Sequence, residues 1–211
     1  MDGEKVLLLL LGWLMGLAAP AITDGIKRRR ENALGRAAIF GELREVAHKL
    51  ALAAHRIYMH QGTVDRQKLE WITGVLERYA GVHDSQRLLE NFRKQLSWTD
   101  PEIAAAAKVV AAGDSRGLVL QKYAVPLLDG RVNALWSFDS SFTRQLLEIR
   151  ASIELLTDLV ERSRYYSGLT FGKLEDGNYD AVVSNFKQCC DEYAERAVQV
   201  VTRIEDLRVH V

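Results

Sequence analysis

Proline and cysteine are scarce in this chain of 211 residues, which contains three prolines and two cysteines. Between Pro20, Pro101 and Pro126 the apolar residues recur every three or four positions and do not alternate with polar ones. This spacing is typical of helices, so it predicts an all-α protein. The cysteines, Cys189 and Cys190, are adjacent, and neighbouring side chains on a helix point in different directions. We therefore expect no disulfide between them, but one buried and one half-exposed reduced thiol.

An excess of charge of either sign is also lacking. The chain has 28 basic and 28 acidic side chains and a formal net charge of zero. Residues 1–30 hold five basic and three acidic side chains, which leaves the rest of the chain slightly acidic. A domain without a broad basic field binds nucleic acid poorly, so we do not expect a nucleic-acid partner.

Several signatures of known chemistry are missing. The sequence has no Lys-Ser/Thr phosphate-binding loop, no His-Glu-x-x-His pair and no paired cysteines at metal-ligand spacing. Glu45 and His48 stand three positions apart, as metal ligands do in di-iron helical bundles, but such a bundle needs this motif twice. The sequence therefore predicts no metal, no cofactor and no enzymatic activity that its motifs would identify.

A long uncharged run lies at the start of the chain. Residues 6–23 include seven leucines and no charged side chain. As a helix they extend about 27 Å, close to the roughly 30 Å hydrocarbon core of a bilayer. The leucines contribute about −3 to −4 kcal/mol toward insertion, which outweighs Gly12, Gly16 and Pro20. The run predicts a transmembrane helix.

A basic cluster follows this run and consists of Lys27, Arg28, Arg29 and Arg30. Four consecutive positive charges remain on the cytoplasmic side and contact anionic lipid headgroups, each worth about 1 kcal/mol. A cleaved signal peptide is the alternative, because Ala18 to Ala21 resemble a cleavage region. The cluster favours an anchor in residues 1–30 of the plasma (inner) membrane, with the N-terminus outside and residues 31–211 forming a cytoplasmic domain.

Small side chains share one face of the predicted membrane helix. Gly12, Gly16 and Ala19 stand at positions i, i+4 and i+7. Such a face allows a second helix backbone to approach closely, so it predicts self-association. Simple tolerance of glycine in a membrane helix is the other interpretation.

Apolar spacing predicts a series of helices after the anchor. The first has a core seam spaced by four and three positions and ends at Gln61 and Gly62, and it is long enough to continue the membrane helix past Asp24 and Gly25. Its seam consists of Ile39, Leu43, Val46, Leu50, Ala53 and Ile57. Three shorter helices are expected: one capped by Thr63 or Asp65 that stops near Gly81, one from Asp84 or Ser85 through Leu96, and one capped by Asp100 that Gly113 closes. A short buried helix and a turn are expected within 114–130. Two long helices around 135–160 and 182–207 complete an antiparallel multi-helix bundle.

Two arginine–histidine pairs lie on the first of these helices. Arg44 and His48, like Arg56 and His60, stand four positions apart and so share a helix face. An imidazole beside a guanidinium can transfer a proton and stabilise a phosphate. In residue types and helical fold class the chain resembles metal-independent ribonucleases of the HEPN type, which place four to six residues between arginine and histidine instead of three. The resemblance implies a membrane-tethered ribonuclease or toxin as an alternative function, whereas two solvated pairs on a polar face are the structural interpretation.

The anchor, the small-residue face and the bundle together predict a membrane-anchored protein that self-associates and acts as a scaffold, sensor or effector. Membrane lipids, further copies of the chain and a protein are the expected partners. Layout alone suggests one more alternative, an oligomeric pore-forming effector of a bacterial defence or stress system.

Overall fold

Every regular element in the described part of the chain is a helix. The computed structural model describes residues 3–79, 83–113, 118–172 and 178–207. The elements are α1 (Gly3–Gln61), α2 (Arg66–Arg78), α3 (His83–Leu96), α4 (Asp100–Gly113), α5 (Pro126–Arg131), the 3₁₀ helix η1 (Val132–Ser137), α6 (Ser140–Leu169) and α7 (Asn178–Leu207). The predicted all-α helical bundle is confirmed.

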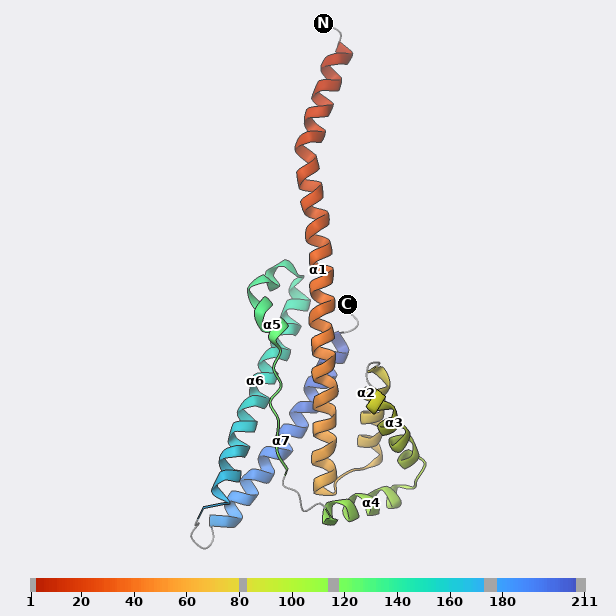
Figure 1. Ribbon diagram of the computed structural model, residues 1–211, viewed down its shortest axis with the longest axis vertical. Helices are drawn as coiled ribbons and strands as arrows, with labels where there is room; N and C mark the ends of the chain where they lie inside the picture. The colour runs from red at the N-terminus through yellow and green to blue at the C-terminus, as the bar shows by residue number, and fades with distance from the viewer. Residues whose placement is uncertain (1–2, 80–82, 114–117, 173–177, 208–211) are drawn as a thin grey trace.

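Helix α1 is continuous from the apolar run into the bundle. Its 59 residues include Pro20, and the helix passes Asp24 and Gly25 without a break. At about 1.5 Å per residue it extends about 88 Å, and its N-terminal part projects beyond all other elements (Figure 1). The exposed residues 23–31 belong to this projecting part.

Within the described residues, no helix combines the length and the apolar character that crossing a membrane requires. The side chains at 4–9, 14, 17–19, 21 and 22 lie outside that description. Many side chains of the predicted 6–23 span, including that of Ala19 on its small-residue face, are therefore outside the description, although the backbone there is helical.

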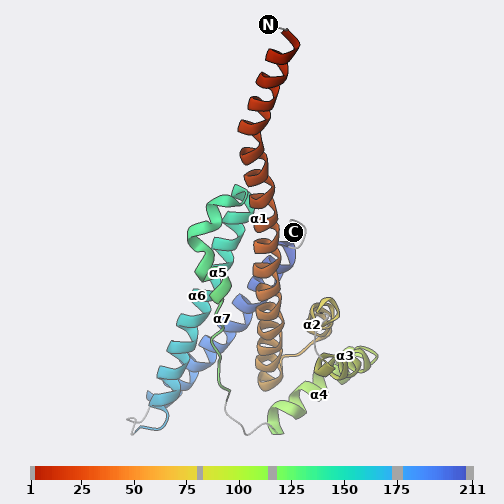
Figure 2. The same cartoon turned by 45° about the horizontal axis from the view of Figure 1, so that its top comes forward.

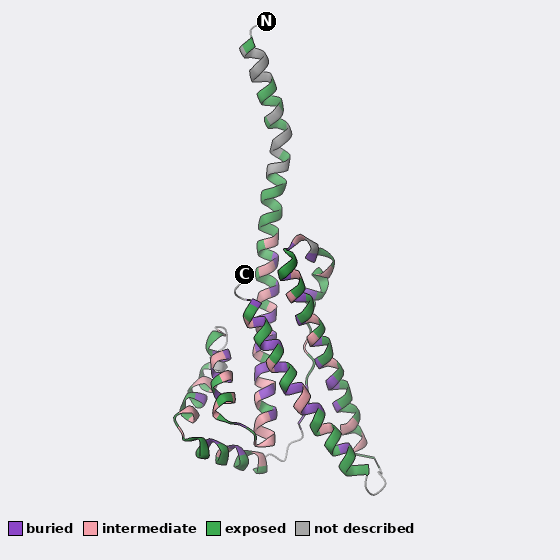
Figure 3. Ribbon diagram, turned by 180° about the vertical axis from the view of Figure 1, so that it is seen from behind, coloured by how far each residue is buried: buried purple, intermediate pink, exposed green. Residues whose placement is uncertain are grey.

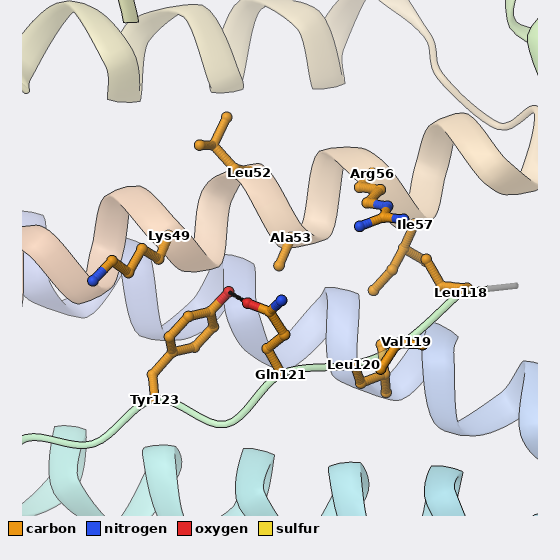
Figure 4. Close-up of a pocket in the computed structure, with 10 residues that line it drawn as sticks. All are labelled: Lys49, Leu52, Ala53, Arg56, Ile57, Leu118, Val119, Leu120, Gln121 and Tyr123. Atoms are coloured by element: carbon orange, nitrogen blue, oxygen red, sulfur yellow. Dashed lines mark hydrogen bonds between the residues drawn. The ribbon is translucent and has the colours of Figure 1, made fainter. Parts of the chain in front are cut away.

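The three long helices pack with α7 between α1 and α6. Helices α1 and α6 run in the same direction and α7 runs against both (Figures 1 and 2). Residues 118–125 pass without regular structure between α1 and α6 (Figure 4). Leu118, Leu120 and Val125 of this segment are buried. The extended segment thus fills the groove that helices α1 and α6 leave open over α7.

Helices α2, α3 and α4 form a lobe on another side of α1 (Figure 2). Gly62 ends α1 with a φ of 66°, a conformation that glycine adopts without strain. A Cβ at this position would lie only 3.2 Å from the Ala111 side chain of α4. The predicted stop at Gly62 is confirmed, and the same residue lets α4 pack beneath the end of α1.

Helix starts follow local capping chemistry. Asp65 caps α2, because its side chain accepts a hydrogen bond from the Lys68 amide at 2.8 Å. Helix α4 begins at Asp100, next to Pro101, so Asp100 is its first residue and not the cap we expected. Thr99 precedes it, and the Thr99 amide and hydroxyl both donate to the Glu102 carboxylate, at 2.7 and 2.8 Å. The local sequence therefore fixes both helix starts.

The prediction for residues 114–130 is partly wrong. Residues 114–117 are not described, and residues 118–125 form no helix. Pro126 starts α5 and does not break a helix. Proline lacks an amide hydrogen and has a φ suited to the first turn, while it disfavours a helical conformation of the preceding Val125. Leu135 and Phe138, expected on the next helix, are buried ahead of α6, which begins at Ser140.

The buried core joins α1, α6 and α7 and continues into the lobe (Figure 3). The predicted seam of α1 is buried except for Ala53, whose neighbour Ala54 is buried instead. Cys189 and Cys190 are both buried, so the half-exposed thiol we expected is wrong. Helix α7 contacts both α1 and α6, which covers two of its faces. Burial raises the pKa of Cys190 to about 12, which keeps this thiol protonated.

Candidate functional site

The candidate ligand site is a cavity of about 420 Å³ between α1 and the extended segment. We call it the Arg56 cavity. Its lining consists of Lys49, Leu52, Ala53, Arg56, Ile57, Leu118, Val119, Leu120, Gln121 and Tyr123. Lys49 and Tyr123 lie at one end, and Arg56 and Leu118 at the other (Figure 4). The volume lies in the range of small-molecule pockets, and most of the lining is apolar.

Contacts from two helices hold the extended wall of this cavity. Tyr193 of α7 is fully buried, and its hydroxyl donates a hydrogen bond to the Gln121 carbonyl at 2.9 Å. Glu42 of α1 accepts hydrogen bonds from the amides of Leu127 and Leu128 at 2.8 and 2.9 Å. Those amides are free donors at the start of α5, where a carboxylate is favourable. The wall is therefore fixed at its middle and at its end.

The cavity has two basic side chains in its lining and no acidic one. The Lys49 Nζ atom lies 3.1 Å from a Glu45 carboxylate oxygen, so Lys49 already has an ion-pair partner. Arg56 is exposed and makes no ion pair or hydrogen bond with the described residues. Burial raises the pKa of Tyr123, so its hydroxyl stays protonated. Arg56 is thus the cation that an incoming anion would meet.

Arg44 and His48 line a second, smaller cleft of about 60 Å³ among α1, α2 and α7. We call it the His48 cleft. The His48 ring stacks on the Tyr79 ring, with the ring centroids 4.0 Å apart. Arg44 donates to the Arg78 carbonyl at 2.5 Å. Arg78 in turn binds both carboxylate oxygens of Glu205 at 2.8 Å. These contacts link the three helices. With about 60 Å³, the cleft is much smaller than the pockets that hold a nucleotide.

Ionisation in the His48 cleft follows from its hydrogen bonds and burial. The Tyr79 hydroxyl donates to the Glu45 carboxylate, which lowers the pKa of Glu45 and raises the pKa of Tyr79. Desolvation lowers the pKa of His48, which favours its neutral imidazole. The Glu45 carboxylate therefore accepts a hydrogen bond from Tyr79 and pairs with Lys49. No group of three or more metal-ligating side chains occurs in the described ranges.

The other predicted pair is not brought together in a cavity. Arg56 lines the Arg56 cavity, whereas His60 is not part of its lining. His60 lies near the end of α1 and is half-buried. The structure therefore unites Arg44 with His48 in one cleft but does not place Arg56 and His60 at a common site.

Near the point where α1 leaves the bundle, Arg28 of the basic cluster lines a cavity of about 470 Å³. The other lining residues are Glu31, Asn32, Arg131, Ala134, Ser137 and Phe138. All four members of the basic cluster are exposed. The Lys27 Nζ atom lies 4.0 Å from a carboxylate oxygen of Glu31. Asn32 and Ser137 exchange hydrogen bonds at 2.9 and 3.0 Å and fix α1 to η1. The sequence alone did not indicate that Arg131 lies beside the basic cluster.

Gly12 and Gly16 lie on the projecting part of α1, and open space surrounds the place where either would carry a Cβ. Large apolar side chains in the same part are also exposed. Leu10 is 53% exposed, Trp13 64% and Met15 65%. No other element of the described protein covers these residues of α1.

Residues Gly113 to Gly117 have the Gly-x-Ser-x-Gly spacing of a hydrolase nucleophile. That nucleophile stands on a turn between a strand and a helix. Here Gly113 ends a helix, and the segment that resumes at Leu118 is extended. The serine itself lies outside the described residues, and the elements described on either side are not those of a nucleophile turn.

No family model matches the chain, and neither a curated protein nor a solved structure matches it.

Proposed function

We propose that the chain is a single-pass membrane protein that self-associates through its membrane helix and acts as a scaffold, sensor or effector through its helical domain. The observation that carries this proposal is the projecting apolar part of α1. Leu10, Leu11, Trp13 and Met15 are all more than half exposed, although such side chains favour an apolar environment. A bilayer would cover them on every side of the helix, as no single protein groove does.

The basic cluster supports the orientation of this helix. It begins four residues after the apolar run ends at Thr23, about 6 Å further along the helix, which is the depth of the headgroup region. Lys27, Arg28, Arg29 and Arg30 would contact anionic headgroups there and keep the bundle on the cytoplasmic side. Arg131 is a further cation beside Arg28.

Extraction of membranes with alkaline carbonate tests the anchor. We expect the wild-type chain to stay in the membrane pellet and Leu10→Lys/Leu11→Lys to leave it, since each lysine near a bilayer centre costs about 3 kcal/mol. Val109→Lys/Val110→Lys, which changes two exposed valines of α4, is the matched control and should behave as wild type. A wild-type chain released from the pellet, and starting near Ile22, would show a cleaved signal peptide and reject the anchor.

Self-association is tested by blue-native electrophoresis of detergent-solubilised protein. We expect wild type to migrate as an oligomer and Gly12→Leu/Gly16→Leu to migrate as a monomer, because leucine keeps two backbones apart. Leu10→Phe/Leu14→Phe adds bulk on the opposite face of the same helix and should leave the oligomer intact. An identical monomer in all three samples contradicts the proposal.

The two alternatives stay predictions with tests of their own. A tethered ribonuclease or toxin requires that His48→Ala or His60→Ala abolish RNA cleavage or toxicity at unchanged expression. A pore-forming effector requires that the reconstituted chain release dye from liposomes, which a passive anchor does not do.

A further inference from the structure

The Arg56 cavity has the chemistry of a small-molecule site. Leu52, Ile57, Leu118 and Leu120 give it apolar walls, and its volume of about 420 Å³ is enough for a ligand of one or two rings. Filling such a cavity with an apolar body removes both surfaces from water, which favours binding.

The polar groups of the cavity select the charge of its ligand. Arg56 presents a guanidinium with no ion-pair partner among the described residues, whereas Lys49 pairs with Glu45 and Lys122 of the wall pairs with Glu161. A single guanidinium matches one carboxylate, which it can bind through two parallel hydrogen bonds. A doubly charged phosphate would need more donors than this lining offers.

The position of the cavity favours a dissolved ligand over a membrane lipid. Arg56 lies 26 positions after Arg30 on the same continuous helix, which is about 39 Å along its axis. A lipid headgroup held near the basic cluster would not reach it. Lys49 and Arg56 are separated by seven positions, about 10 Å, and this spacing sets the length of the apolar body between the two ends.

We propose that the Arg56 cavity binds a small monocarboxylate with an apolar body, held by the Arg56 guanidinium at one end and by the apolar side chains of α1 and of residues 118–123 along its length. This site does not depend on the membrane anchor. A ligand there would contact α1 and the extended segment together and so stabilise their association.

Isothermal titration of the full chain in detergent with 2-naphthoate tests the proposal, with 2-naphthylmethanol as the uncharged analogue and empty micelles as the blank. We expect the acid to bind wild type more tightly than the alcohol. Arg56→Gln should weaken the acid roughly tenfold, the usual loss for a charge-assisted hydrogen bond, and should leave the alcohol unchanged. Arg144→Gln, which removes another exposed arginine on α6, should bind both as wild type does.

A second variant separates the cavity from the rest of the surface. Ala53→Trp places an indole in the lining and should abolish binding of the acid, with helicity checked by circular dichroism. Should that variant fail to fold, the comparison of Arg56→Gln with Arg144→Gln decides alone, since both residues are exposed. Any one of three results overturns the proposal. These are equal binding of the acid and the alcohol to wild type, an equal loss of acid binding in both arginine variants, and no binding of the acid at all.

Discussion

At the scale of single residues, buried polar groups determine how the domain responds to pH. The Nδ1 atom of His55 is buried without a hydrogen-bond partner, and its ring packs edge-on against Phe92 with the centroids 4.6 Å apart. Burial lowers the pKa of His55 to about 4. The neutral imidazole is therefore the form that the folded protein tolerates.

Acidification should destabilise the domain through this residue. Since the unfolded pKa is about 6.5, the stabilising effect of the neutral imidazole is present above that pH and is lost as the pH falls toward 4. We expect a loss of about 2 kcal/mol in the free energy of unfolding between pH 7 and pH 5. Urea titrations of wild type and His55→Gln at both pH values measure it. Most of this loss should be absent in the variant. Part of the loss that remains in the variant comes from His48, because burial also lowers the pKa of His48. An equal loss in both proteins contradicts the prediction.

At the scale of elements, the short and irregular parts depend on long-range contacts. Helix α5 has six residues, too few to be stable alone, and its first amides are bound by Glu42 from α1. The extended segment before it is held by Tyr193 from α7. Arg66 of α2 similarly binds the connection between α3 and α4, donating to the Leu96 and Trp98 carbonyls at 2.9 and 2.5 Å.

Removing the Glu42 cap should loosen α5 without unfolding the bundle. We expect Glu42→Ala to lower the free energy of unfolding by about 1–2 kcal/mol, the usual effect of losing a capping carboxylate. The amides of Leu127 and Leu128 should exchange their hydrogens faster, as hydrogen exchange followed by mass spectrometry can measure. Glu148→Ala, on the exposed face of α6, is the control and should leave exchange in α5 unchanged. Unchanged exchange in Glu42→Ala would show that the cap does not hold α5.

At the scale of the whole molecule, the projecting part of α1 and the bundle are separable. The earliest contacts of α1 with the rest of the described protein are the side chains around Arg28 and Asn32. Arg36 then binds α6 through Asp139 at 2.6 Å and lies over the Phe142 ring. The side chains that the structure describes before this region are all exposed, so they add no packing to the domain.

A chain that begins at Gly25 should therefore keep the fold of the bundle. We expect its thermal midpoint to lie within about 2 °C of the midpoint of the full chain, because the described core side chains begin at Ile39 and all remain. Circular dichroism melts of both proteins in the same detergent test this. A chain that begins at Gly41 lacks Ile39 and the Arg36 contacts, and it should melt at a lower temperature. A large drop in the first variant would mean that residues 1–24 contribute to the core.

Local chemistry in the sequence determined the helices other than α5 and η1, the start of α2, the end of α1 and most of the α1 seam. Apolar spacing, caps and glycine act within a few residues of one another, so the sequence shows them directly. Only the tertiary structure decided the path of residues 118–125, the burial of both cysteines and the convergence of Arg44, His48, Tyr79 and Glu205. These features depend on which faces meet across α1, α2 and α7, and side chains distant in sequence determine that packing.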